Sequence, residues 1–181
     1  GRMTAPFWEA VSAVDRSGWR RGPWDGEPDH ETWEISPGVR GLIRRTDYSG
    51  TLCWYLILGP DHPWFWQEFI FDIIDTPTPH RARDGHWVIG WDGNHHWHDA
   101  PGRAWEAGVY VTFTAARDML AAAAEHISKS PTPDDIQNSI YWAERGVRVW
   151  SVDPSSEYGA MLHREAVERL TALRTIAERA P

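Results

Sequence analysis

The chain has 181 residues and a formal net charge of −8, a size that favours one compact domain. Its 41% hydrophobic and 24% charged residues exclude an intrinsically disordered protein. The acidic balance argues against direct nucleic-acid binding, because lysine and arginine supply most of the affinity for the phosphate backbone.

The first predicted elements are a helix and a β-hairpin. Apolar residues recur at helical spacing between positions 5 and 14, and Thr4 is the predicted N-cap. The turn dipeptide Pro37–Gly38 then separates the stretches 32–36 and 39–45. Two such stretches on either side of a turn predict a pair of antiparallel strands.

Further strands are predicted in the middle of the chain. Residues 51–58 form a nearly continuous apolar run that ends at Gly59–Pro60, which is typical of a central strand buried on both faces. Residues 64–74 fit either a helix or a strand, and their aromatic and isoleucine content favours a strand. Residues 86–91 and 109–113 alternate in the manner of half-buried strands.

Helices dominate the last third of the sequence. A helix is predicted over 114–128, with its first threonine as N-cap and an alanine run of high helix propensity. The segment 130–133 alternates serine or threonine with proline, which indicates a linker. Beyond it we expect a helix over 134–144, a short strand over 147–152 and an amphipathic helix over 155–179.

These elements predict an α+β fold. A mostly antiparallel sheet of about five to six strands would be packed by N-terminal, central and C-terminal helices. Residues 3–181 would then form one domain, with a core over 4–128 and a helical C-terminal extension over 131–181. Residues 1–2 precede a methionine and have the character of a cloning scar.

Cysteine usage and hydropathy predict the compartment. Cys53, the one cysteine, lies within the apolar run, so it forms no disulfide within the chain and is interpreted as a structural thiol rather than a nucleophile. No apolar stretch reaches the roughly 20 residues that a membrane span needs, and the first residues do not resemble a signal peptide. We therefore expect a cytoplasmic protein without membrane contact.

Histidine and aspartate concentrate just after the strand predicted at 86–91. Four of the nine histidines fall between positions 86 and 98. Imidazole and carboxylate groups together can hold a metal ion or run acid–base chemistry. The candidate site consists of Trp91, Asp92, His95, His96, Trp97, His98 and Asp99. The alternative is a solvated loop in which the aspartates only make local hydrogen bonds.

A divalent metal is the cofactor that this cluster would hold, with His95, His96 and His98 as predicted ligands. In an extended segment, His96 and His98 point to the same side, as two ligands of one ion require. His62 is a further candidate, because it follows the central strand and Pro63 restrains it to extended geometry. An ordinary exposed turn residue is the alternative interpretation of His62.

Three blocks occur in a recognisable order: Leu52–Cys53–Trp54–Tyr55–Leu56, then His62–Pro63–Trp64, then His86–Trp87–Val88–Ile89–Gly90–Trp91–Asp92 with His95 after two residues. Over residues 50–128 this pattern resembles a family of small uncharacterised phage and actinobacterial mobile-element proteins. The resemblance implies a bacterial host cell and four matched polar positions, namely His62, Asp92, His95 and Asp99. The chain departs from the family at Trp54, where a glycine is usual, in the His-Gly-Gly segment reduced to His80, and after Pro131.

Three functional hypotheses follow. The leading one is a phage or mobile-element accessory protein that counteracts a host defence by binding a small polar ligand or a host partner. Tryptophans of this tryptophan-rich chain would stack a ring, and Arg81 or Arg83 would meet a phosphate. Its pocket would be lined by His62, Asp92, His95 and His98. The alternatives are a metal-dependent hydrolase built on Asp92, His95, His96 and His98, and an acidic protein-interaction module without a pocket.

Overall fold

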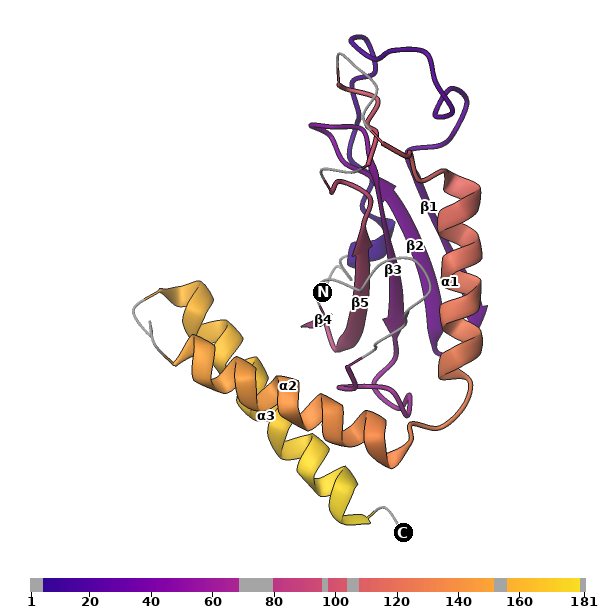
Figure 1. Ribbon diagram of the computed structural model, residues 1–181. Coiled ribbons are helices and arrows are strands. Elements are labelled where there is room, and N and C mark those ends of the chain that lie inside the picture. The colour runs from indigo at the N-terminus through magenta and orange to yellow at the C-terminus, as the bar shows by residue number, and fades with distance from the viewer. Residues whose placement is uncertain (1–4, 69–79, 96–97, 104–107, 152–155, 180–181) are drawn as a thin grey trace.

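A single antiparallel sheet forms the centre of the molecule (Figure 1). The computed structural model describes residues 5–68, 80–95, 98–103, 108–151 and 156–179. The strands lie in the order β1-β2-β3-β5-β4, so β3 is central and β4 is an edge strand. Their bounds are His30–Ser36 (β1), Val39–Arg45 (β2), Leu52–Leu58 (β3), His80–Arg83 (β4) and His86–Asp92 (β5). The predicted α+β fold with an antiparallel sheet is confirmed.

The hairpin of β1 and β2 forms where the turn dipeptide predicts it. Gly38 has a φ of 76°, a left-handed conformation that glycine adopts without strain. Along the pair, Trp33 lies opposite Gly41, and a Cβ at Gly41 would come within 2.8 Å of the Trp33 ring. The missing side chain therefore makes room for an indole on this face of the hairpin.

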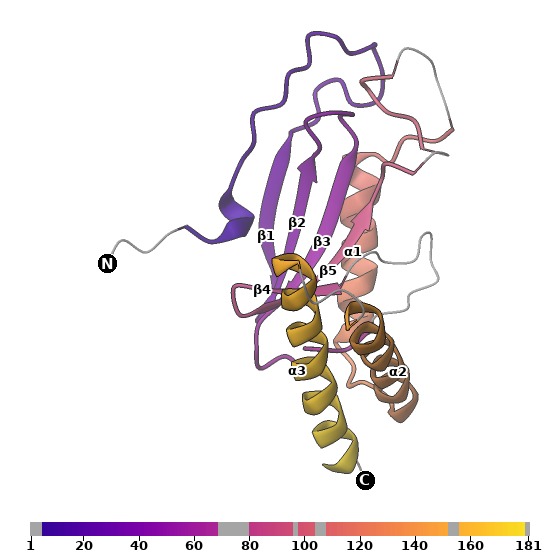
Figure 2. The same cartoon turned by 90° about the vertical axis from the view of Figure 1, so that its left-hand side faces the viewer.

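Helix α1 (Phe113–Ile127) covers one face of the sheet and encloses the main core with it (Figure 2). Thr112 caps the helix by accepting a hydrogen bond from the backbone N–H of Ala115. Small side chains let the helix approach the sheet closely. The buried residues of this core include Ile43, Trp54, Leu56, Leu58, Trp87, Ile89, Trp91, Phe113, Ala116, Leu120 and Ala123.

The opposite face of the sheet carries a much smaller apolar cluster. Leu42, Ile57 and Val88 are buried there, and Phe7, Trp8 and Tyr55 pack partly against them. Phe7 and Trp8 belong to a short 3-10 helix, Phe7–Glu9, which lies on this side of the sheet (Figure 2). Among the described residues, no long helix packs against these three buried side chains, so polar groups and rings of this face stay within reach of solvent.

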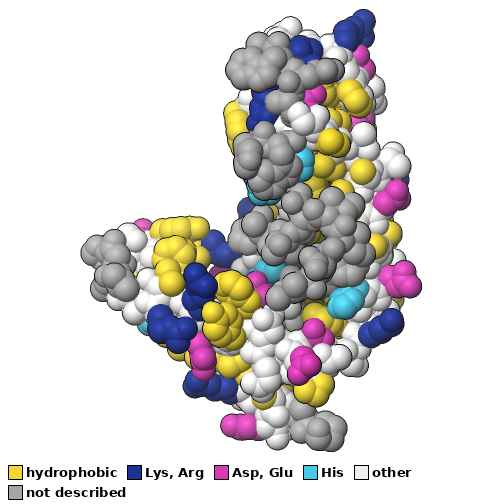
Figure 3. All heavy atoms as spheres, in the orientation of Figure 1, with side chains coloured by type: hydrophobic (Ala, Val, Ile, Leu, Met, Phe, Trp, Pro, Cys, Tyr) yellow, Lys and Arg dark blue, Asp and Glu magenta, His cyan; other side chains and the backbone are white. Residues whose placement is uncertain are grey.

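Helices α2 (Pro133–Trp150) and α3 (Glu157–Arg179) form a hairpin beside β4 (Figure 1). A capping box between Thr132 and Asp135 begins α2, and the two helices approach closely where Gly146 meets Ala166. Hydrophobic side chains gather on the surface of this hairpin (Figure 3). In the described part of the chain, no helix combines the length and apolar character that crossing a bilayer requires.

Side chains of both helices join the hairpin to the segment before β4. The guanidinium of Arg169 donates to the backbone oxygen of Trp66 at 2.7 Å and to the carboxylate of Glu68 at 2.6 Å. The hydroxyl of Ser139 accepts from the backbone N–H of Glu68 at 2.6 Å. The segment before β4 is thus fastened to both helices.

The helix predicted at the N-terminus is wrong beyond one turn. Only Phe7–Glu9 is helical, and no side chain caps it. The rings of Phe7 and Trp8 pack against the sheet, whereas Val11 is 66% exposed and buries no helical face. Tertiary contacts of two aromatic rings therefore override a weak helical periodicity.

Other boundaries also differ from the prediction. The expected strand at 109–113 is a single bridge between His98 and Val109, because α1 already begins at Phe113. The strand expected at 147–152 is wrong, because residues up to Trp150 belong to α2. Of the strand predicted over 64–74, residues 64–66 lie in turns, and residues 69–74 lie outside the described residues.

Candidate functional site

Asp92 stands at the end of β5, opposite Cys53 of β3. One of its carboxylate oxygens accepts a hydrogen bond from the backbone N–H of Asn94 at 2.8 Å and from the Cys53 thiol at 3.6 Å. Burial, reinforced by the Asp92 charge, raises the pKa of Cys53 to about 12, so the thiol stays protonated at neutral pH. This environment supports the interpretation of Cys53 as a structural thiol.

His95 and His98 do lie together. Their ring centroids are 5.4 Å apart, and the backbone N–H of His95 donates to the Nδ1 atom of His98 at 3.2 Å. His98 is 5% exposed and Asp99 is 7% exposed. The carboxylate of Asp99 accepts from Arg20 at 2.8 Å and from the backbone N–H of Ala100 at 2.9 Å. Asp99 therefore ties the loop after β5 to the N-terminal segment.

Asp99→Asn is expected to lower the free energy of unfolding by about 1 to 3 kcal/mol, because Arg20 would lose its charged partner in a mostly buried place. Urea denaturation followed by tryptophan fluorescence measures the change. Asp25→Asn is the matched control, since Asp25 forms an exposed pair with Arg21 at 3.4 Å and should change stability very little. Equal effects of the two substitutions would contradict the anchoring role of Asp99.

The predicted metal site is not assembled by the residues that the structure describes. Among them, no three histidine, cysteine, aspartate or glutamate side chains are grouped so as to hold an ion. Two members of the predicted site, His96 and Trp97, lie outside the described residues. Trp91 is 6% exposed and belongs to the core beneath α1.

His62 lies at the other end of the sheet from Asp92. The antiparallel register pairs Cys53 with Asp92 and Leu58 with Trp87, and His62 follows the Leu58 end of β3. Five residues of a strand span roughly 17 Å. The Nδ1 atom of His62 accepts from the backbone N–H of Trp64 at 3.1 Å, and burial lowers its pKa. The structure therefore does not bring His62 to the cluster around Asp92.

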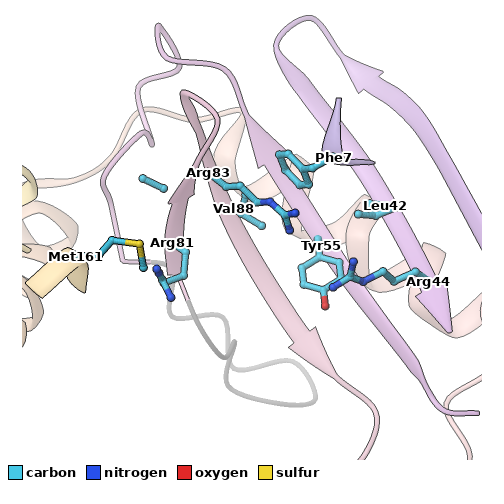
Figure 4. A pocket seen from close by; sticks show the side chains of 9 residues that line it. Phe7, Leu42, Arg44, Tyr55, Arg81, Arg83, Val88 and Met161 are labelled. Atoms are coloured by element: carbon cyan, nitrogen blue, oxygen red, sulfur yellow. The ribbon is translucent and has the colours of Figure 1, made fainter. Parts of the chain in front are cut away.

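A different hollow lies on the sheet face opposite α1 (Figure 4). Its volume is about 420 Å³, and we call it the arginine groove. Strands β2, β3, β4 and β5, the N-terminal 3-10 helix and α3 all contribute to it. It is lined by Phe7, Leu42, Arg44, Tyr55, Arg81, Ala82, Arg83, Val88 and Met161.

Two of its arginines lie over aromatic rings (Figure 4). The guanidinium of Arg44 is 5.4 Å from the centroid of the Tyr55 ring, and that of Arg83 is 4.3 Å from the centroid of the Phe7 ring. Both arginine side chains are exposed, and neither forms an ion pair with a carboxylate among residues with described positions. Their charges are thus oriented by cation–π contacts and remain available to an anion.

Arg81, the third arginine of the groove, is held by α3. Its Nη1 atom donates to the hydroxyl of Tyr158 at 3.0 Å, and its Nε atom lies 3.5 Å from a carboxylate oxygen of Glu165. Because Met161 of the same helix also lines the groove, α3 supplies both a wall and the support of a cation. Among the described residues that line the groove, none is an aspartate or a glutamate.

The groove floor is apolar. Leu42 and Val88 form it, and Tyr55 adds a hydroxyl group. Burial, with a contribution from neighbouring Cys53, raises the pKa of Tyr55 to about 12. The phenol therefore remains a hydrogen-bond donor at neutral pH. Cations around an apolar floor with one neutral donor suit a ligand that is both anionic and partly apolar.

The sequence prediction named Arg81 and Arg83 as phosphate contacts but missed Arg44, Phe7 and Tyr55. The overlooked signal is the alternation along β2, because Arg40, Leu42 and Arg44 share one strand face. Leu42 of β2 pairs with Tyr55 of β3, which puts the Tyr55 ring on the same surface as Arg40 and Arg44. A strand that presents charges on a thinly covered face is a binding candidate.

Comparison with known proteins adds no further assignment. No protein-family model matches the chain, and neither a curated protein nor a solved structure matches it. The resemblance to mobile-element proteins therefore stays a prediction.

Proposed function

We propose that this protein binds a small organic anion in the arginine groove. The observation that carries the proposal is the convergence of Arg44, Arg81 and Arg83 on an apolar floor whose described lining includes no carboxylate. The chain as a whole carries a net charge of −8, so a local excess of cations stands out against its acidic background. The volume of about 420 Å³ lies within the usual range of small-molecule sites.

The chemistry of the groove defines the ligand class. One guanidinium group can donate two parallel hydrogen bonds to two oxygens of a phosphate or carboxylate. This gives it more geometric specificity than an ammonium group has. The floor and the rings of Phe7 and Tyr55 favour a ligand that also carries a ring or another apolar portion. A phosphorylated or carboxylated ring compound meets both requirements.

This proposal keeps the ligand-binding hypothesis and moves its pocket away from the histidine and aspartate cluster. In line with the resemblance, the protein would act as an accessory of a phage or mobile element in the cytoplasm of a bacterial host. Capturing a small anion on which a host defence depends is the role that joins this context to the groove. Neither a metal ion nor a nucleic acid is needed for such capture.

The arginines are tested with an anionic aromatic probe, 8-anilinonaphthalene-1-sulfonate. The double variant Arg44→Gln/Arg83→Gln is expected to bind the probe about tenfold more weakly or worse, since each charged contact contributes more than 1 kcal/mol. Fluorescence titration measures the dissociation constant. Both side chains are exposed, so thermal unfolding should stay near that of the unmodified protein.

The control removes two positive charges elsewhere. Arg21→Gln/Arg148→Gln has the same change in net charge, and both of these side chains are exposed away from the groove lining. It should bind the probe as the unmodified protein does. Equal weakening in both double variants would mean that only net charge matters, and unchanged binding in Arg44→Gln/Arg83→Gln would refute the groove as the binding site.

A further inference from the structure

A second, more polar hollow adjoins the arginine groove. Its volume is about 240 Å³, and it shares the lining residues Arg44 and Tyr55 with the groove. The rest of its wall comes from the N-terminal segment, the start of β1, the end of β2 with the turn after it, and Cys53 of β3. We call it the polar hollow. The two spaces are therefore neighbours that meet at one arginine and one tyrosine.

The two spaces differ in charge. The described residues that line the groove include three arginines and no carboxylate, whereas Asp29 and Asp47 both line the polar hollow. The buried Arg45 of the hollow is already neutralised by Glu27 and Asp29, at 3.1 and 3.0 Å. An anionic group is thus favoured in the groove and disfavoured in the hollow.

The polar hollow is suited to hydroxyl groups. Asp47 is exposed and forms no hydrogen bond or ion pair within the described ranges, so its oxygens can accept from a ligand. Thr46 and Tyr48 add hydroxyl groups to the same wall. A carboxylate flanked by hydroxyl groups accepts hydrogen bonds from the adjacent hydroxyls of a sugar, which carry no charge to be repelled.

Arg44 and the protonated hydroxyl of Tyr55 stand where the two spaces meet. A phosphoryl group at this junction would receive hydrogen bonds from both. Its ring-bearing side would then lie on the apolar floor of the groove, within reach of Arg83. Its other side would extend into the polar hollow.

We propose, building on the function proposed above, that the two spaces take one ligand of the nucleoside diphosphate sugar class. The base lies in the groove, the diphosphate lies at the junction against Arg44 and Tyr55, and the sugar lies in the polar hollow beside Asp47. The negative charges of the diphosphate match Arg44 at the junction and Arg83 in the groove, whereas Arg81 is already paired with Glu165. Along such a ligand, an apolar base is followed by an anionic diphosphate and then by a sugar rich in hydroxyl groups. The apolar floor of the groove, the junction and the polar hollow follow one another in the same order.

Calorimetric titration of the full chain with UDP-glucose, ADP-glucose, UDP and ADP tests this assignment. Each sugar nucleotide is expected to bind about tenfold more tightly than its diphosphate, because hydrogen bonds to a charged acceptor contribute this much. Asp47→Ala should abolish that difference without weakening the diphosphates. Asp61→Ala is the control, since it removes one exposed carboxylate from a turn outside both linings and should preserve the difference.

The possible failures separate the two proposals. Equal affinity of UDP-glucose and UDP, or a tenfold difference that survives in Asp47→Ala, would overturn the sugar assignment. Failure of all four nucleotides to bind, while the dye still depends on Arg44 and Arg83, would overturn the ligand class and leave anion binding intact. If the dye bound equally well after both Arg44 and Arg83 were replaced, the proposed function itself would be overturned.

Discussion

Arg45→Met is expected to lower the free energy of unfolding by about 3 to 5 kcal/mol, because the substitution leaves buried polar groups without their charged partner. The side chain of Arg45 is fully buried, with a relative exposure of 0%. Its guanidinium donates to the carboxylates of Glu27 and Asp29 and to the hydroxyl of Tyr110 at 2.7 Å. Methionine fills similar space and cannot satisfy any of these groups.

Urea denaturation at neutral pH measures this loss, and Arg117→Met provides the matched control. Arg117 pairs with Glu31 at 2.7 Å, but its side chain is 47% exposed, so about 0 to 1 kcal/mol is expected there. Since Glu27 also accepts from the backbone N–H of Phe113, the variant should loosen the start of α1 as well. A small and equal effect of both substitutions would contradict a structural role for the buried network.

Glu68→Gln is expected to have the second largest effect. One oxygen of Glu68 lies 3.1 Å from the Nδ1 atom of His80, and the other accepts from Arg169 at 2.6 Å. Burial opposes ionisation of this carboxyl, but the hydrogen bonds and charges of His80 and Arg169 outweigh it and lower the pKa to about 2. The residue thereby links the segment before β4 to α3.

The lowered pKa defines a pH window. A carboxyl group whose pKa falls from 4.5 to about 2 on folding contributes stability above pH 4.5 and loses it as the pH falls towards 2. The shift corresponds to about 3 kcal/mol. Glu68→Gln should be less stable by this order at pH 7, and its deficit relative to the unmodified protein should shrink between pH 4.5 and 2.

Urea denaturation at several pH values between 7 and 2 follows the difference between the two proteins. Glu125→Gln is the control, because Glu125 is exposed on α1 and its substitution should leave the difference near zero at every pH. A deficit of Glu68→Gln that stays constant from pH 7 to 2 would show that ionisation of Glu68 does not stabilise the fold.

The elements that could be predicted from the sequence are those whose pattern reflects burial on a defined face. The apolar run of β3, the alternation of β5 and the Pro37–Gly38 turn all express local physics that the fold retains. Strand β4 could not be found in this way, because an edge strand reading His-Arg-Ala-Arg buries little and shows no apolar alternation. The prediction of an N-terminal helix is wrong because the rings of Phe7 and Trp8 pack on the sheet.

The candidate site illustrates a different difficulty. Clustering along the sequence drew attention to His95, His98 and Asp99, whereas the structure uses Asp99 as an anchor for a loop. The groove combines residues from positions 7 to 161, which strand pairing and the docking of α3 bring together. Only the register of β2 against β3 shows that Arg44 and Tyr55 share a surface. The distance between Arg44 and Tyr55 along the sequence does not indicate that they share a surface.

The position of β4 gives the helical hairpin a second structural role, which is to cover an edge of the sheet. As the outermost strand, β4 turns backbone groups outward, and an uncovered strand edge can template pairing with another chain. Here the N–H of Ala82 donates to the carboxylate of Glu165 of α3 at 3.3 Å, so the hairpin occupies that edge. Conditions that undock the hairpin, acid among them, would therefore uncover the backbone groups of this strand edge, and the short length and the two arginines of β4 would then be the remaining protection against pairing with another chain.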